Sequence, residues 1–177
     1  MENGRTTGLK LALLILLVPL AVFAWWLRER YEARLPIAAN ERSASGCLRF
    51  LATIEEDFRE NDRDGNGVHD YWTRDVAGLH KFVVRARSSP AIELIPRSYA
   101  EADGASEGAR PHNGYYLKAL EVDEKTKFGF CAYPADYDRT GRWTFVINET
   151  KKLYRVDTQG KPIVRWAPDA ATWKPLD

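Results

Sequence analysis

Residues 37–62, IAANERSASGCLRFLATIEEDFREND, decide how we expect the chain to fold. Apolar side chains recur there every three or four positions, which predicts an amphipathic α-helix with one apolar face. The apolar stripe consists of Ala44, Leu48, Leu51, Ile54 and Phe58, and other faces carry Arg42, Arg49, Glu55, Glu56 and Arg59. Such a helix needs an apolar surface to pack on, and we expect that surface to be a β-sheet.

Five later segments are typical of β-strands, because they are short and rich in aromatic and β-branched residues. They are residues 114–122 (GYYLKALEV), 127–134 (KFGFCAYP), 142–149 (RWTFVINE), 152–157 (KLYRVD) and 162–166 (PIVRW). The turns between the last three are short, which favours an antiparallel meander. Before the strands, residues 95–102 predict a short helix, and residues 101–114 predict a flexible surface segment. The predicted fold class is therefore α+β.

The N-terminal region contains a long apolar run. Residues 11–27, LALLILLVPLAVFAWWL, are seventeen residues without a charge. This length is at the short end of what crosses a membrane, and Lys10 and Arg28 can reach the two interfaces. The run predicts a transmembrane helix at 11–27 after a short cytoplasmic head at 1–10. Residues 28–177 would then form an extracytoplasmic domain of a single-pass, signal-anchored protein of the cell membrane.

Two other interpretations of this run stay open. The first is a signal peptide, with Arg5 and Lys10 as its basic region and a cleavage site after Ala24. The second is a core helix buried inside the domain. Cleavage would release a secreted protein, whereas an anchor would keep the chain at the membrane, so membrane extraction with carbonate distinguishes the first two cases.

Residues 61–72, NDRDGNGVHDYW, follow the amphipathic helix and have the pattern of a calcium-binding loop. In such loops alternate oxygen-bearing side chains turn inward, and glycine permits the sharp turn. The predicted ligands are Asp62, Asp64, Asn66, the backbone carbonyl of Val68, and Asp70. Thr73 stands where an EF-hand has its bidentate glutamate, so the loop resembles a thrombospondin type 3 repeat. We expect a structural calcium site with a Kd of about 10⁻⁴ to 10⁻³ M; the alternative is a solvated turn without metal.

Composition and motifs exclude several classes of function. The chain has 26 Lys and Arg against 25 Asp and Glu, and no basic tract indicates a nucleic-acid partner. Its three histidines form no known catalytic or zinc-binding spacing. Asp136 and Asp138 could serve as the paired carboxylates of a hydrolase, but a turn before a strand explains them. We therefore predict no catalytic residue and no enzymatic activity.

Several segments together resemble an uncharacterised bacterial family of pilin-like proteins, related to type IV pilins and general secretion pseudopilins. The resemblance covers roughly residues 44–173 and is carried by residues 61–79 (NDRDGNGVHDYWTRDVAGL), 92–103 (IELIPRSYAEAD), 114–124 (GYYLKALEVDE) and 127–149 (KFGFCAYPADYDRTGRWTFVINE). It implies a long N-terminal helix, half in the membrane, packed on an antiparallel sheet. Pseudopilins of type II secretion bind calcium, and other envelope or pilin-like proteins would be the partners.

The chain departs from this family at its N-terminus. Prepilins resemble G-F-T-L-I-E around their cleavage point, whereas Gly8 is followed here by LKLAL, with Leu13 where the glutamate should be. This difference argues against prepilin processing. The function predicted from the sequence is a membrane-anchored, pilin-like structural or interaction protein with a calcium loop. The alternatives are a secreted calcium-dependent binding module and an unrecognised hydrolase.

Cys47 and Cys131 are the only cysteines. A disulfide between them would close a long loop and stabilise the fold by about 4 to 5 kcal/mol in the loop-closure model. Cysteine is also among the most buried residues when it is free. The sequence leaves both states open, a Cys47–Cys131 disulfide and two buried free thiols.

Overall fold

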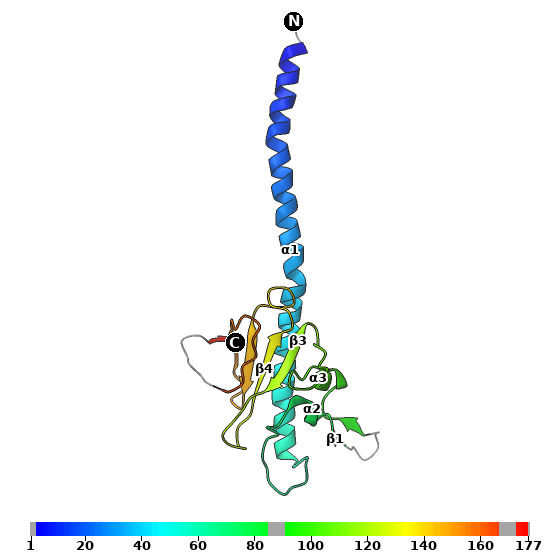
Figure 1. Cartoon of the computed structure of the whole chain (residues 1–177), viewed down its shortest axis with the longest axis vertical. Helices are drawn as coiled ribbons and strands as arrows, with labels where there is room; N and C mark the ends of the chain where they lie inside the picture. The colour runs from blue at the N-terminus through cyan, green and yellow to red at the C-terminus, as the bar shows by residue number, and fades with distance from the viewer. Residues whose placement is uncertain (1–2, 85–90, 167–172, 177) are drawn as a thin grey trace. The chain divides into compact units, whose positions relative to one another are not determined.

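The computed structural model describes residues 3–84, 91–166 and 173–176. The chain divides into two compact units, Met1–Pro36 and Ile37–Asp177. Helix α1 (Asn3–Glu60) is continuous over 58 residues and belongs to both units (Figure 1). The division falls directly after Pro36, which lacks a backbone N–H and therefore removes one hydrogen bond from the helix.

The predicted transmembrane helix at residues 11–27 is wrong. Among the residues that the structure describes, no helix combines the length and the apolar character that a membrane span requires. The uncharged run has seventeen residues, whereas a span uses about 20, and α1 continues from it into the charged sequence RERYEAR at 28–34. The predicted fold class is therefore wrong in its first element, the N-terminal transmembrane helix. The same finding also corrects the predicted signal anchor and the predicted single-pass location in the cell membrane.

The main sheet has five antiparallel strands in the order of the sequence. These are β3 (Tyr115–Ala119), β4 (Gly129–Pro134), β5 (Thr144–Asn148), β6 (Leu153–Val156) and β7 (Lys174–Leu176). The first four lie within predicted segments, but residues 162–166 form no strand: Arg165 makes one isolated parallel bridge to Glu121. The fifth position belongs to β7, which pairs Leu176 with Leu153.

Short elements connect α1 to this sheet. They are α2 (Val76–Leu79), β1 (Val83–Val84), β2 (Ile92–Glu93) and α3 (Arg97–Glu101), and β1 and β2 pair as a small antiparallel sheet. Helix α3 lies within the short helix predicted at 95–102. Asp103 is fully buried, and its Oδ2 atom accepts hydrogen bonds from the backbone amides of Val76 (2.8 Å) and Ala77 (2.9 Å). This carboxylate therefore satisfies the N-terminus of α2 and fastens it to the start of the 101–114 segment.

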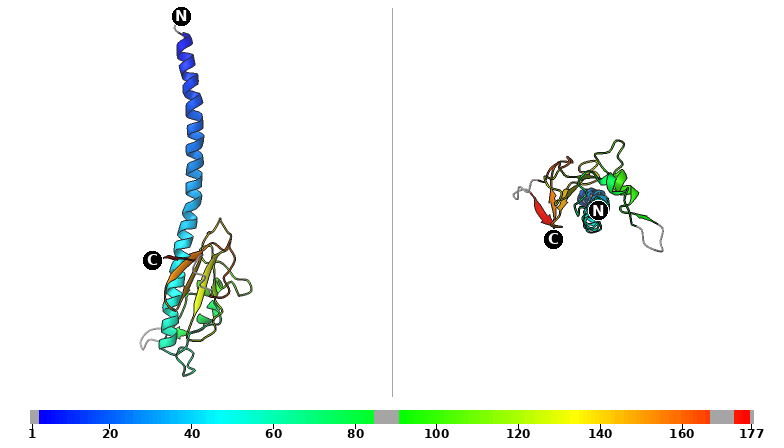
Figure 2. Two further views of the ribbon diagram at one scale, coloured as in Figure 1. Left: turned by 90° about the vertical axis from the view of Figure 1, so that its left-hand side faces the viewer. Right: turned by 90° about the horizontal axis from the view of Figure 1, so that it is seen from below.

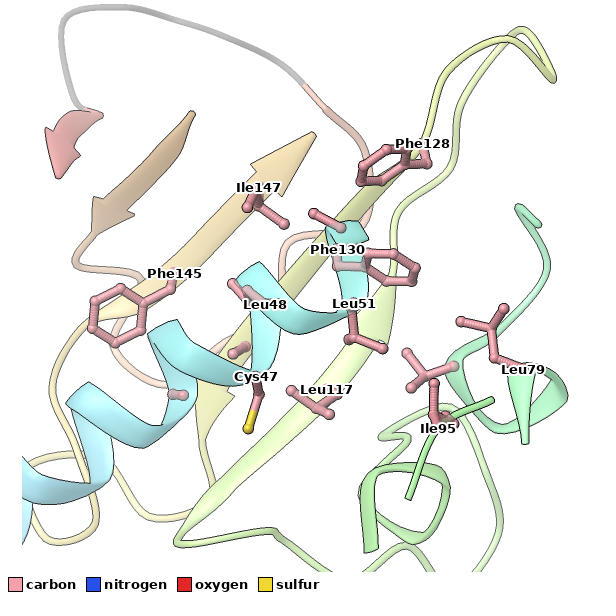
Figure 3. Close-up of a cluster of buried hydrophobic side chains, with 14 of the residues drawn as sticks. Cys47, Leu48, Leu51, Leu79, Ile95, Leu117, Phe128, Phe130, Phe145 and Ile147 are labelled. Carbon is pink, nitrogen blue, oxygen red and sulfur yellow. The ribbon is translucent and has the colours of Figure 1, made fainter. Parts of the chain in front are cut away.

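The second half of α1 packs on one face of the main sheet (Figures 2 and 3). Leu48 and Leu51 are completely buried in a cluster with Leu117, Phe130 and Ile147 of the strands. The predicted stripe needs one correction at its end. Glu55 is the fully buried residue four positions after Leu51, whereas Ile54 is only partly buried beside the cluster.

The opposite face of the sheet carries a smaller apolar cluster. Alternate residues of β4 point to opposite faces, so Phe130 and Ala132 face α1 while Cys131 does not. Cys131 instead joins Leu120 and Val146, and four partly buried residues pack against them: Tyr133, Ile163, Trp166 and Trp173. The segment containing Ile163 and Trp166 thus covers this face without joining the sheet.

Candidate functional site

The predicted calcium loop begins where α1 ends. After Glu60 the chain turns through Asp62, Gly65 and Gly67, whose φ angles are 44°, 68° and 78°. A side chain at positive φ is strained, and glycine relieves that strain at two of the three positions. The loop therefore folds back within a few residues, as the Asn, Asp and Gly content predicts.

Loop side chains accept hydrogen bonds from the loop's own backbone. Asp62 Oδ1 accepts from the amide of Asn66 (3.1 Å), and Asp62 Oδ2 accepts from the amide of Gly67 (2.9 Å). The side-chain oxygen of Asn66 accepts from the amide of Val68 at 2.6 Å, and the side-chain nitrogen of Asn66 donates to Asp64 Oδ2 at 2.7 Å. These bonds hold the loop in a defined shape and use oxygens that were predicted as ligands.

Asp70 connects the loop to the sheet. Its side chain is only 8% exposed, and its Oδ2 atom lies 3.1 Å from the ammonium of Lys125 in the turn between β3 and β4. The next amide, that of Tyr71, donates to the backbone carbonyl of Lys125 at 3.0 Å. Two contacts of different kinds thus join the end of the loop to this turn.

The predicted ligands are therefore close in sequence but do not converge as a metal shell. Among the described residues, no three or more His, Cys, Asp or Glu side chains are grouped so that they could hold a metal ion. The carbonyl of Val68 accepts from the amide of Asp70 at 3.0 Å. A small pocket of about 60 Å³ lies beside Asp64, Asp70 and Lys125, and its other lining residues are Phe58 and residues 71–74. The donor atoms are all oxygens, which suits calcium in chemistry.

A buried carboxyl group lies on α1 near the loop. Glu55 Oε2 accepts a hydrogen bond from the amide of Trp72 at 2.9 Å, while Oε1 is buried and has no partner within the described chain. Burial raises the pKa of Glu55 well above its usual value; the bond from Trp72 opposes this shift, and the charge of Glu56 adds to it. Glu56 in turn accepts from the hydroxyl of Tyr71 at 2.8 Å.

Sequence reasoning missed two of these residues. Lys125 carries no local signal, since its contact with Asp70 joins positions far apart in the chain. Glu55 did carry a signal, because it lies four residues after Leu51 and three before Phe58, which is the spacing of the apolar stripe. We assigned Glu55 to another face because charged residues are rarely buried.

The two cysteines are free and lie on opposite sides of the sheet. Cys47 belongs to the α1 side, whereas Cys131 Sγ donates to the carbonyl of Ile163 at 3.3 Å on the other side. Burial raises the pKa of the Cys47 thiol and raises that of Cys131 to about 12. Both thiols are therefore protonated and poor nucleophiles at neutral pH.

The two carboxylates considered for a hydrolase lie in a turn. The carbonyl of Asp136 accepts from the amides of Arg139 (3.1 Å) and Thr140 (2.8 Å), and Asp138 has a φ of 60°. The Asp136 side chain pairs with Arg139 at 3.1 Å. These contacts are those of a polar turn between β4 and β5.

A second candidate surface lies in the unit Met1–Pro36. Five large apolar side chains are 48% to 63% exposed there: Leu20, Val22, Phe23, Trp25 and Leu27. Phe23 also stacks on Trp26, with ring centroids 6.0 Å apart. A group of exposed apolar side chains of this size is a candidate surface for contact with another molecule.

Comparison of the chain with protein-family models, curated proteins and solved structures finds no match.

Proposed function

We propose that this protein is a structural or interaction protein of the kind that its resemblance to pilin-like proteins implies, and that residues 20–27 of α1 bind another copy of the chain. The exposed apolar side chains of this segment support the proposal. Fully burying one such side chain is worth about 1.5 to 3 kcal/mol. Each of these side chains is about half exposed, so covering it would contribute about half of that amount, and covering several of them together would favour association.

The spacing of these residues favours a helix as the binding partner. Leu20, Phe23 and Leu27 follow one another at intervals of three and four, so they lie along one side of α1. This is the spacing of a seam between two packed helices. A second copy offers the same seam, and identical surfaces can pair around a two-fold axis.

Analytical ultracentrifugation of the full chain tests this proposal. The variant Leu20→Lys, Phe23→Lys, Leu27→Lys should sediment as a monomer at concentrations where the unmodified chain associates, because three charges cannot be buried in the seam. A matched control adds three lysines at exposed positions in the second half of α1, through Ala39→Lys, Gly46→Lys and Thr53→Lys, and should still associate.

Two results would contradict self-association. One is equal association of the seam variant and the unmodified chain. The other is a monomeric chain that floats with phosphatidylcholine vesicles, because a lipid surface rather than a second copy would then cover residues 20–27.

The same proposal includes a structural calcium ion in the loop. Asp62, Asp64, Asn66 and Asp70 offer the oxygen donors that calcium prefers, and the loop joins the end of α1 to the turn that contains Lys125. A bound ion would therefore strengthen the connection between helix and sheet. Isothermal titration of the full chain with calcium chloride should show one ion bound per chain. Absence of binding would remove calcium from the proposal and leave the association of α1 untouched.

A further inference from the structure

We propose that a groove between α1 and the turn from β5 to β6 binds a small organic anion, a negatively charged group on an apolar or aromatic body. The groove has a volume of about 470 Å³, which is the size of a pocket for a small molecule. Its lining includes Arg49 of α1 and two residues of the turn, Lys151 and Lys152. Three positive charges from segments far apart in the sequence therefore meet at one concave surface.

These positive charges have no counterpart in the described part of the chain. No carboxylate of a described residue lines the groove, and no ion pair between described residues involves Arg49, Lys151 or Lys152. Glu149 of the same turn lines a different pocket, together with Phe128. A concave surface lined by charges of one sign attracts ligands of the opposite sign. The groove therefore favours an anion.

The rest of the groove is apolar or aromatic. Its other lining residues are Leu153 and Tyr154 of β6 and Pro175 and Leu176 of β7. An apolar body gains free energy by covering such side chains, whereas an inorganic ion does not. Pockets for small molecules combine a lining of this kind with a few charged groups that orient the ligand. The combination of charges and apolar residues therefore favours an organic anion over an inorganic one.

Strand β7 lies at the edge of the main sheet, where an extended peptide would be another conceivable ligand. A peptide that adds as a further strand pairs with the backbone of the edge strand. Pro175 is the middle residue of the three in β7, and proline has no amide N–H for such pairing. The sequence of β7 therefore disfavours a peptide strand and favours a ligand that the side chains of the groove recognise.

Lys151 has a backbone conformation that residues with a side chain rarely adopt. Its φ is 59°, in the left-handed region where glycine is free of strain. The amide of Lys151 closes the turn by donating to the carbonyl of Asn148 at 2.8 Å. Glycine would make the same hydrogen bond with less strain, so the turn does not need the lysine side chain. A change at this position therefore separates the charge of the groove from the stability of the fold.

The test is isothermal titration of the full chain at low salt with phenyl phosphate, and with inorganic phosphate and benzyl alcohol as its charged and apolar parts. One phenyl phosphate should bind per chain, roughly threefold or more tightly than inorganic phosphate, because its ring covers apolar side chains. Benzyl alcohol should not bind. Arg49→Gln, Lys151→Gly and Lys152→Gln should each weaken the binding of phenyl phosphate roughly threefold to tenfold. Lys151→Gly should do so while melting at the same or a higher temperature than the unmodified protein.

Two matched controls come from the segment that follows β6. Lys161→Gln removes a positive charge from another exposed position, and Gln159→Gly replaces a residue at a φ of 54° without changing the charge. Both should bind phenyl phosphate as the unmodified protein does. An equal loss of affinity in Lys161→Gln would overturn the inference, because the overall charge of the protein would then explain the effect.

Three further results would contradict the inference. The first is that phenyl phosphate does not bind to the unmodified protein. The second is unchanged binding by the variants of Arg49, Lys151 and Lys152, which would place the anion elsewhere. The third is equal affinity for phenyl phosphate and inorganic phosphate, which would show that the apolar lining does not contact the ligand.

Discussion

The two halves of α1 carry similar apolar residues in opposite environments. Between residues 44 and 58, apolar side chains at helical spacing are buried against the sheet, and Leu48 and Leu51 are completely covered. Between residues 20 and 27, large apolar side chains are about half exposed. The main sheet covers the second half, whereas within the unit Met1–Pro36 these side chains of the first half are exposed. Apolar spacing therefore predicts which residues need cover, but the remainder of the chain determines whether cover exists.

The largest expected difference between the halves concerns stability. Leu51→Ala should lower the free energy of unfolding by about 2 to 5 kcal/mol, because the removed side chain leaves a cavity among packed neighbours. Leu27→Ala should change it by less than about 0.5 kcal/mol, because Leu27 is 48% exposed. Urea denaturation followed by near-UV circular dichroism, at a concentration where the chain is monomeric, measures both. Equal losses would show that the first half is also packed in the monomer.

Glu55 extends the comparison of the two halves, because it is an ionisable group in the buried half of α1. Its pKa is raised in the folded state, so the folded protein holds a proton that the unfolded chain releases above its usual value of 4.5. The folded protein is therefore stabilised by the protonated carboxyl group of Glu55 at low pH. This stabilisation is lost as the pH rises from 4.5 through the pKa that Glu55 has in the folded state. Glu55→Gln cannot ionise and should remove this loss of stability.

The measurement for Glu55 is urea denaturation at several pH values between acid and neutral. The variant should gain stability relative to the unmodified protein as the pH rises. Parallel pH profiles for the two proteins would show that Glu55 does not titrate in this range and would contradict its burial beside Glu56.

The third prediction concerns the proposed calcium loop, which follows the end of the buried half of α1. Asp64→Ala should lower the melting temperature by a few degrees in calcium and should have no such effect in chelator. An ion at about ten times its Kd adds about 1.4 kcal/mol to stability, which corresponds to a shift of this size. Differential scanning calorimetry in both buffers provides the comparison. If variant and unmodified protein melt together in calcium, the loop has no structural ion.

The smallest expected effect on stability concerns the cysteines. Their chemical labelling shows whether the two thiols are buried and unpaired, and it requires no substitution. Cys47 and Cys131 should each take up one alkyl group under denaturant without reductant, and neither should react in the folded state because both are buried. Mass spectrometry of the alkylated protein counts the groups. Uptake of none until a reductant is added would demonstrate a Cys47–Cys131 disulfide and require α1 to approach the other side of the sheet.

Local patterns in the sequence predicted the elements that depend on local residues. The segments of β3 to β6 are dense in aromatic and β-branched residues, and the second half of α1 has a clear period. Strand β7 was missed because it has three residues and contains Pro175. Its position depends on pairing with β6, and no local pattern encodes that contact. A proline at a sheet edge is common, since an edge residue needs no ladder hydrogen bond on its outer side.

The candidate site also has one part that the local sequence predicts and one part that depends on distant residues. The turn at residues 62–67 follows from its Asn, Asp and Gly content, because these residues tolerate positive φ. The partner of Asp70 could not be predicted, since Lys125 belongs to a turn of the sheet. The proposed membrane span failed for a different reason. An uncharged run of seventeen residues satisfied a local rule of composition, but the helix that contains it continues through a charged segment.

The order of strands in the main sheet has a consequence for how the chain folds. Every pairing from β3 to β7 joins neighbours in sequence, so the sheet can form from local contacts, and local contacts form quickly. Helix α1 is synthesised before the strands that cover Leu48 and Leu51, which lie at residues 115–153. The apolar stripe of α1 is therefore uncovered while more than sixty further residues are added. This interval is the stage at which the nascent chain is most exposed to aggregation and most in need of a chaperone.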